Sequence, residues 1–361
     1  MHFNSRISIV TKTQQFFDSF SWKHKLNKKL LFVYKEYEYD HELYAMIRFL
    51  KKHYQNIDFL SFKAKERPRE NPGLLSAKLY EQIVTCKPEV IFTYEKILSL
   101  DEIAHICNLG IQLVTYTCGV HTFAYGGASS QKDAIEMLRQ HSLYLIPHAP
   151  HVARITSEGV NAQEFSFWYE PEWFHPLRAN KIYDILFIGD LVAPLNSNRL
   201  DLLSYLSQYY KITLVSDVDP NLRNVNCIGS TSNPRKLNMW INQSKLVLGS
   251  DRIGAHKSLN NLSGQYIFYE DEFFMRQRAY PVMGAGACYL VERHTEVENK
   301  FTDGYEIILW NGYDDLVEKV KQLLSNENEY KWIGMNASSK CILEHSVGVR
   351  VNQFVELVTN L

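Results

Sequence analysis

Short apolar runs alternate along the chain with segments whose apolar residues recur at every third or fourth position. The run Leu30–Tyr34 is continuous and apolar, and the next segment, Leu43–His53, places its apolar residues on one side of a helix. A continuous apolar run is typical of a strand that is buried on both faces. Strands that are joined by helices form parallel sheets through right-handed crossovers. The pattern therefore predicts an α/β fold with doubly wound parallel sheets.

The alternation occurs in two series that are separated by the aromatic segment Ser166–Leu177, in which Pro171 and Pro176 oppose helix formation. The expected strands are Leu30–Tyr34, Ile57–Phe62, Val90–Tyr94, Ile111–Tyr116, Leu143–Ile146, Tyr183–Ile188, Lys211–Val215, Leu246–Leu248, Ala287–Val291 and Ile307–Leu309. The expected helices are Leu43–His53, Leu74–Cys86, Asp101–Leu109, Ser130–His141, Leu200–Tyr209, Lys236–Gln243, Phe273–Met283, Asp314–Ser325, Tyr330–His345 and Gly348–Thr359.

This organisation predicts two Rossmann-like domains, residues 1–170 and 178–345, which face each other across a cleft at the carboxyl ends of their strands. The last helix, within residues 346–361, can cross back to the first domain. The aromatic segment between the series either stacks on a sugar or packs between the domains.

The composition is that of an ordinary globular chain. Of the 361 residues, 45% are hydrophobic and 22% are charged, and the formal net charge is −1. These values exclude wholesale disorder, which requires low hydrophobicity and high net charge. The six cysteines form no CxxC pair, so we interpret them as buried small residues in a reducing compartment. No apolar run approaches the roughly 18 residues of a membrane span, and the start carries no apolar signal core. We therefore expect a cytoplasmic protein.

The charge is unevenly distributed. Residues 1–100 contain 17 basic and 11 acidic side chains, and four of the lysines follow Trp22 closely. This local excess leaves open a peripheral contact with a membrane surface, or recognition of a nucleic-acid acceptor. A solvated basic face is the other interpretation.

The second half of the chain carries the more specific pattern. Two Rossmann-like halves without a Gly-x-Gly-x-x-Gly turn after the first strand suggest the GT-B glycosyltransferase architecture. Residues 276–290 read RQRAYPVMGAGACYL, and FTDGYE follows at residues 301–306. Together with Asp315 and a His…Arg segment near the end, this pattern resembles the glycosyltransferase group 1 C-terminal domain of the spore-maturation (CgeB-like) family. The matching positions are Arg278, Tyr280, Gly286, Phe301, Gly304, Glu306, His345 and Arg350.

This resemblance, clearest over residues 185–361, implies a hexosyl- or pentosyltransferase that uses a nucleotide-diphosphate sugar and needs neither cofactor nor metal. It favours a glycan or a lipid-linked glycan as acceptor. A metabolite, a protein or a DNA or RNA base remains possible as acceptor, and the oligomeric state is left open. The carboxylate with which the family holds the donor ribose or sugar is replaced by Pro281. Two alternatives therefore remain: a non-catalytic sugar- or nucleotide-binding protein of the same fold, and a nucleotide-sugar epimerase.

Glycosyl transfer requires that charge on the diphosphate leaving group is stabilised, which cations and helix N-termini can do. Two groups of basic residues and glycines follow expected strands of the second series, where parallel sheets bind ligands. A third group lies on the expected helical piece that carries Arg276 and Arg278 and ends in the glycines Gly284 and Gly286, which allow a ligand to approach the backbone. Solvated surface loops and a plain glycine turn are the competing interpretations. The donor-binding candidates are Gly189, Asp190, Arg199, Arg252, Lys257, Glu272, Arg276, Arg278, Tyr280, Gly284 and Gly286.

A transfer that inverts the sugar also requires a base that accepts the acceptor proton. His121 follows the strand that ends at residue 116, and Asp40 follows the first strand, so both are catalytic candidates. His121 can equally be a hydrogen-bonded structural histidine, and Asp40 can cap the helix that starts at Glu42. His148 and His151 lack further ligands for zinc, so no metal site is expected.

Overall fold

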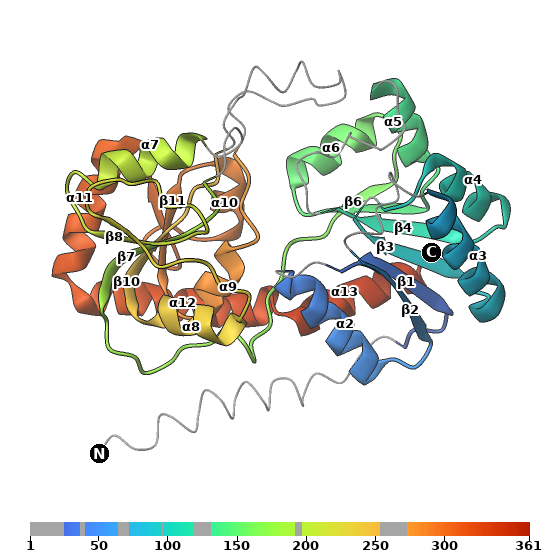
Figure 1. Cartoon of the computed structure of the whole chain (residues 1–361), viewed down its shortest axis with the longest axis horizontal. Helices are drawn as coiled ribbons and strands as arrows, with labels where there is room; N and C mark the ends of the chain where they lie inside the picture. Colours follow the sequence, from blue (N-terminus) through green and yellow to red (C-terminus); the bar gives the residue numbers. More distant parts are fainter. Residues whose placement is uncertain are drawn as a thin grey trace.

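The computed structural model describes residues 25–36, 40–63, 72–95, 97–117, 131–191, 197–252 and 273–361. Two parallel sheets with six strands each form two halves that lie side by side (Figure 1). Helices cover the faces of both sheets. The architecture confirms the predicted α/β fold with two doubly wound halves.

The first sheet has the strand order β2-β1-β3-β4-β5-β6, and every neighbouring pair is parallel. Its strands are β1 (Leu30–Lys35), β2 (Ile57–Phe62), β3 (Val90–Tyr94), β4 (Gln112–Tyr116), β5 (Leu143–Ile146) and β6 (Ala162–Glu164). The helices of this half are α2 (His41–His53), α3 (Pro72–Cys86), α4 (Leu100–Asn108), α5 (Gln131–Arg139) and α6 (Ala149–Ser157).

The second sheet has the order β12-β11-β10-β7-β8-β9, again parallel throughout. Its strands are β7 (Tyr183–Ile188), β8 (Ile212–Val215), β9 (Val225–Cys227), β10 (Ser244–Leu248), β11 (Cys288–Glu292) and β12 (Ile308–Trp310). The helices of this half are α7 (Ser197–Leu206), α8 (Pro234–Asn242), α9 (Ala279–Gly284), α10 (Thr295–Lys300), α11 (Gly312–Ser325) and α12 (Glu327–Glu344).

Alternate side chains of each strand enter cores on opposite faces of its sheet. In β1, Leu30 and Phe32 pack with α2, whereas Leu31 and Val33 pack on the other face. Both sets are fully buried, which explains the continuous apolar run in the sequence.

The last helix, α13 (Val347–Thr359), lies beside α2 under the first sheet (Figure 1). Its Phe354 ring packs edge-on against Phe92 of β3 at 4.7 Å between ring centroids. The chain therefore returns to its first half after it has completed the second sheet.

The aromatic segment that connects the halves is part of the cores. Phe165 and Trp168 belong to the core of the first half, and Phe167, Tyr169 and Phe174 belong to that of the second. The exposed fraction of each of these side chains is 5% or less, so the described aromatic residues serve packing between the halves rather than an open stacking surface.

Four short elements depart from the sequence prediction: α6, β6, β9 and α10 were not expected. Three of them are at most six residues long, below the length at which periodicity is readable. The helix expected at Phe273–Met283 begins only at Ala279. The residues before it are not helical: 273–276 are extended and 277–278 form a turn.

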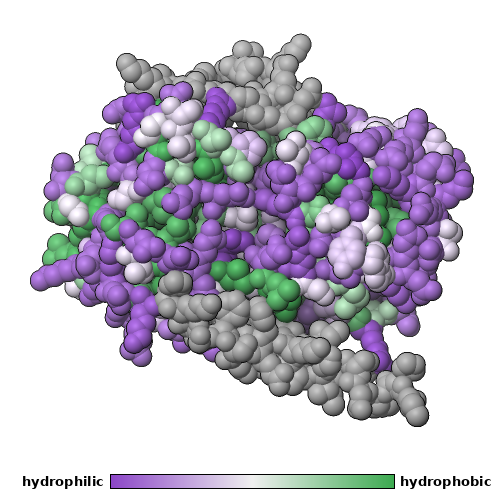
Figure 2. All heavy atoms as spheres, turned by 180° about the vertical axis from the view of Figure 1, so that it is seen from behind, coloured by the Kyte–Doolittle hydropathy of each residue, from purple (hydrophilic) through white to green (hydrophobic). Residues whose placement is uncertain are grey.

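The face seen in Figure 2 is mostly hydrophilic, with hydrophobic side chains in smaller patches. Within the described ranges, no helix combines the length and the apolar character that are needed to cross a bilayer.

Candidate functional site

Three arginines of the second half gather at the carboxyl ends of its strands. Arg199 lies in the first turns of α7, and Arg276 and Arg278 directly precede α9. Arg199 donates to the Asp190 carbonyl oxygen at 2.6 Å. Gly189 permits this cluster, because an added Cβ there would meet Arg278 Nη1 at 3.0 Å.

The cluster carries positive charge that nearby carboxyl groups offset only in part. Burial and the charges of Arg278 and Arg276 lower the pKa of Arg199 to about 9, and burial lowers the pKa values of Arg276 and Arg278. Arg276 Nε is buried without a hydrogen-bond partner. None of the three forms an ion pair with a carboxylate of the described residues. Such a cluster is built to receive an anion.

Two carboxyl groups that the sequence reasoning did not select lie next to the arginines. Asp251 follows β10, is fully buried and accepts hydrogen bonds from the Arg276 amide at 3.1 Å and from His294 Nε2 at 3.2 Å. Glu292 ends β11 and accepts from the Asp251 amide at 3.0 Å. Burial and the charge of Asp251 raise the pKa of Glu292 to about 7. Only their position after expected strands could have indicated these two residues.

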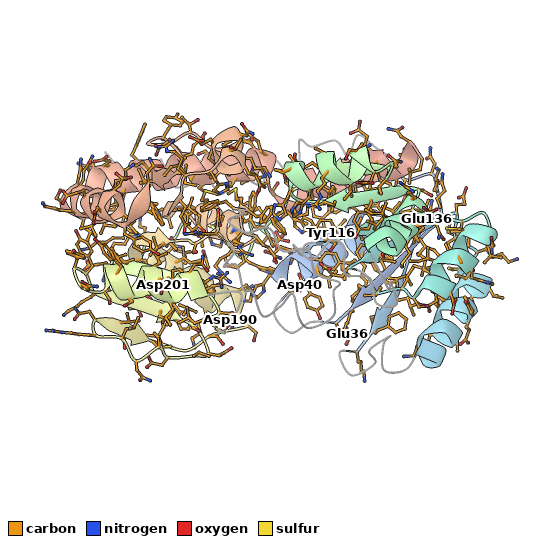
Figure 3. All side chains as sticks on the ribbon, turned by 90° about the horizontal axis from the view of Figure 1, so that it is seen from above. Glu36, Asp40, Tyr116, Glu136, Asp190 and Asp201 are labelled. Carbon is orange, nitrogen blue, oxygen red and sulfur yellow. The ribbon has the colours of Figure 1, made fainter. Side chains whose placement is uncertain are left out.

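Asp40 lies on the facing side of the first half, where β1 leads into α2. Figure 3 shows Asp40 and Asp190 on the sides of the two halves that face each other. Asp40 Oδ1 accepts from the Leu43 amide at 2.9 Å, which caps α2, and from Tyr94 Oη at 3.3 Å. The helix begins at His41, two residues before the start of the expected helix Leu43–His53. Burial and the neighbouring Glu95 raise the pKa of Asp40 to about 6.

A contact between Glu42 of the first half and Gln277 joins the acidic residues Asp40 and Glu42 to the arginine cluster. The Glu42 side chain, 8% exposed, hydrogen-bonds Gln277 and faces the charge of Arg278. Burial and the charge of Asp40 raise the pKa of Glu42 well above its ordinary value. The structure thus brings the predicted Asp40, Asp190, Arg199, Arg276 and Arg278 to one interface between the halves.

Three other candidates sit elsewhere. Gly284 and Gly286 lie against the connecting segment, since a Cβ would meet the Tyr169 ring at 2.3 Å and Pro176 at 3.0 Å, respectively. Packing accounts for both glycines without a ligand. The Tyr280 ring is fully buried and stacks near His345, 4.7 Å between ring centroids.

The remaining candidates are placed as follows. The backbone of Arg252 pairs with that of Phe273 in an isolated antiparallel β-bridge, and the Arg252 guanidinium carbon lies 6.0 Å from the centre of the Phe273 ring. His121, Lys257 and Glu272 lie outside the described residues.

The histidine pair considered for zinc has another role. His148 Nδ1 contacts the Glu296 carboxyl at 3.2 Å, and both residues are buried. Among the described residues no three His, Cys, Asp or Glu side chains are grouped to hold a metal ion.

Comparison with known proteins defines the class. Residues 189–356 match the family model described as glycosyl transferase-like. Sucrose-phosphate synthase from Thermosynechococcus elongatus has a similar structure, with a TM-score of 0.63 at 9% identity over 91% of this chain and 98% of that chain. Anabaena HepE in complex with UDP-glucose gives a TM-score of 0.61 at 11% identity over 93% and 100%. A glycosyltransferase from Rickettsia africae gives 0.61 at 10% identity over 92% and 98%.

No curated protein matches the chain. The solved structures establish the GT-B fold, and the family match covers the half that carries the arginine cluster. The chain therefore has the GT-B fold, and its second half is similar to glycosyl transferases. The matched stretch begins directly after β7 and runs into α13, so it includes the other five strands of the second sheet and most of the helix that returns to the first half.

Proposed function

We propose that the chain transfers a sugar from a nucleoside diphosphate sugar to a hydroxyl acceptor, and that Arg199, Arg276 and Arg278 hold the diphosphate. The observation that carries this proposal is the meeting of three buried or half-buried guanidinium groups, from two separate segments, without carboxylate partners among the described residues. The similar HepE structures contain UDP or UDP-glucose, which supports a donor of this kind.

Electrostatics explain why the cluster suits a leaving group. Buried cations without ion-pair partners are costly, and a bound diphosphate would offset that cost in both the substrate complex and the transition state. The negative charge on the leaving group grows toward the transition state, so the same arginines bind the transition state more tightly than the substrate. Their charge supplies what a metal supplies in other enzymes, which supports transfer without a bound metal.

Glu292 is our candidate for the carboxylate that Pro281 does not provide. It ends β11 at the same edge of the sheet as the arginines, and its only described hydrogen-bond donor from another residue is the Asp251 amide. A carboxyl group with a free oxygen can accept hydrogen bonds from the vicinal hydroxyls of a ribose. This arrangement favours a nucleoside whose ribose approaches β10 and β11.

Asp40 is our candidate for the base that accepts the acceptor proton. It lies opposite the arginine cluster, and its pKa of about 6 leaves it ionised at neutral pH while it is a stronger base than an ordinary aspartate. This role implies inversion at the anomeric carbon. The second catalytic candidate, His121, remains a prediction.

The finer assignments belong to the same proposal. The match at Arg278, Tyr280, Phe301 and Glu306 supports a relation to the CgeB-like family, and a glycan or lipid-linked glycan remains the favoured acceptor. The cysteines among the described residues are free thiols, which supports a reducing, cytoplasmic compartment.

Calorimetric titration with UDP, GDP, ADP and TDP, and with their sugars, tests the donor site. We expect Arg278→Gln to weaken binding about 10- to 150-fold, since a hydrogen bond between charged groups contributes about 1.5–3 kcal/mol. The control is Arg235→Gln, which removes an exposed arginine at the start of α8. Glu292→Gln should weaken nucleoside diphosphates but leave inorganic diphosphate unchanged. Equal affinities for wild type and Arg278→Gln would refute the proposed site.

A further inference from the structure

A polar cavity lies between the two halves, apart from the arginine cluster. Its volume is about 480 Å³, within the range of small-molecule sites. The first half contributes the start of α6 and the end of β6, the second contributes α10 and α12, and the returning helix α13 contributes Arg350 and Gln353. The residues that matter most are Glu164, Glu296, Lys300, Lys340, His345 and Arg350. A lining of this polarity suits a polar or charged ligand.

The extended segment at residues 274–278 separates this cavity from the proposed donor site. The Met275 amide donates to Glu296, which lines the cavity, at 3.3 Å. The next amide, of Arg276, donates at 3.1 Å to Asp251 beside the arginine cluster. Phe274, 2% exposed, packs against His148 and closes the wall between them. The two sites therefore lie on opposite sides of one segment.

Two buried hydrogen-bond donors of residues that line the cavity lack an acceptor. Arg350 Nη2 lies 3.4 Å from His345 Nδ1, and because a guanidinium can only donate, Nδ1 must be the accepting nitrogen. Burial and the charge of Arg350 lower the pKa of His345 to about 3, so the ring is neutral and its proton is on Nε2. Neither His345 Nε2 nor Arg350 Nε has a hydrogen-bond partner.

Both side chains are more than nine-tenths buried: His345 is 7% exposed and Arg350 is 6% exposed. Arg350 also donates to the Glu344 carbonyl oxygen and to Gln353, but it forms no ion pair with a carboxylate of the described residues. A buried guanidinium whose Nε is left without an acceptor is costly. A water molecule or a ligand oxygen would satisfy it.

The other cations of the cavity differ in their pairing. Lys300 is saturated, since its ammonium contacts Glu164 at 2.9 Å and Glu296 at 3.0 Å. Lys340 has only long contacts, 3.6 Å to Glu306 and 4.0 Å to Glu344. The charge available to a ligand is therefore that of Arg350 and Lys340.

We propose that this cavity binds a small ligand through an oxyanion, a carboxylate or a phosphate group, which lies beside the guanidinium of Arg350 and the ammonium of Lys340. The anion offsets the charge of the buried guanidinium, which has no carboxylate partner among the described residues. Because both halves and the connecting segment line the cavity, the bound ligand stabilises this arrangement of the halves.

Calorimetry at constant ionic strength in chloride buffer tests the proposal, with inorganic phosphate and succinate as probes. The experiment uses the Arg278→Gln chain, in which we expect binding at the arginine cluster to be about 10- to 150-fold weaker. We expect one equivalent of at least one probe to bind, and Arg350→Gln in that chain to weaken it at least about tenfold. Lys340→Gln, at a partly exposed position, should weaken it severalfold even if the Arg350 variant fails to fold.

The control Lys321→Gln removes a cation that is 70% exposed on α11, and it should leave the affinity unchanged. Tighter binding of phosphate assigns a phosphate-bearing ligand, and tighter binding of succinate assigns a carboxylate. If neither probe binds, or if Lys340→Gln and Arg350→Gln leave binding intact, the cavity holds water only and the proposal fails. Loss of nucleotide binding in Arg278→Gln with phosphate binding retained would separate this site from the donor site.

Discussion

Replacement of Glu296 by glutamine tests whether the buried contact between the halves stabilises the protein. Glu296 contacts His148 across the interface at 3.2 Å and Lys300 at 3.0 Å, and its side chain is 4% exposed. Burial opposes the ionisation of Glu296. The hydrogen bond and charge of His148 and the ammonium of Lys300 have the larger effect, so the pKa of Glu296 is lowered from 4.5 to about 2.

The magnitude follows from this difference. One pKa unit corresponds to about 1.4 kcal/mol, so ionised Glu296 contributes about 3 kcal/mol to the free energy of unfolding at neutral pH. The loss of one partner from a buried pair costs about 3–5 kcal/mol in other proteins, which agrees. Because the folded-state pKa is the lower one, this stability is complete above pH 4.5 and is lost as the pH falls toward 2.

Urea denaturation followed by circular dichroism measures the effect. We expect Glu296→Gln to lower the free energy of unfolding by about 3 kcal/mol at pH 7 and by about half of that near pH 3, where wild-type Glu296 begins to take up its proton. The matched control is Glu298→Gln on the same helix, whose carboxylate is 44% exposed and pairs with Arg293. It should change stability by less than about 1 kcal/mol. A loss at Glu296 of under about 1 kcal/mol, or one independent of pH, would refute the reasoning.

Three further predictions concern the interface. Asp40→Asn should lower kcat about 10²- to 10⁴-fold without weakening donor affinity, and the wild-type rise of kcat/KM with pH through about 6 should vanish; an unchanged pH profile would exclude this base. Glu42→Gln should keep most activity, because burial raises the pKa of Glu42 and favours its neutral form, and glutamine preserves that neutral form and can still hydrogen-bond Gln277; a loss as large as that of Asp40→Asn would contradict it. Gly284→Ala should destabilise the fold by about 1–3 kcal/mol in thermal unfolding, since its Cβ meets the Tyr169 ring, and Tyr169→Leu should relieve part of the loss.

The strands could be predicted because they are buried on both faces. Each of the ten expected strands overlaps a strand of the structure, since a continuous run such as residues 90–94 has no other compact solution. The strand β9, with one exposed and two half-buried residues, carries no such signal. The helix α6 was not predicted, because His148, Pro150 and His151 are residues typical of loops, although Pro150 suits the first turn of a helix.

Side-chain partners from opposite halves could not be predicted. Asp40 and Arg199 are predicted because they follow strands, and strand ends of a parallel sheet meet at one edge, whereas Arg276 and Arg278 are predicted from the glycines that follow them. The partner of His148 is 148 positions away, and that of Glu42 lies in the segment that crosses between the halves. Such pairs depend on how the two sheets face each other, which no local pattern encodes.

The interface between the halves buries both carboxyl groups and arginines, and burial shifts their pKa values in opposite directions. Loss of water raises the pKa values of Asp40 and Glu42 and lowers those of the three arginines, so each side holds its charge at a cost. The charge of Asp40 contributes to the raised pKa of Glu42, so burial and this charge both oppose a second negative charge beside Asp40. If a diphosphate binds at the arginines, as we propose, its negative charge would oppose ionisation of Asp40 and make Asp40 a stronger base. The loss of water that makes the arginines costly without an anion would then strengthen this effect.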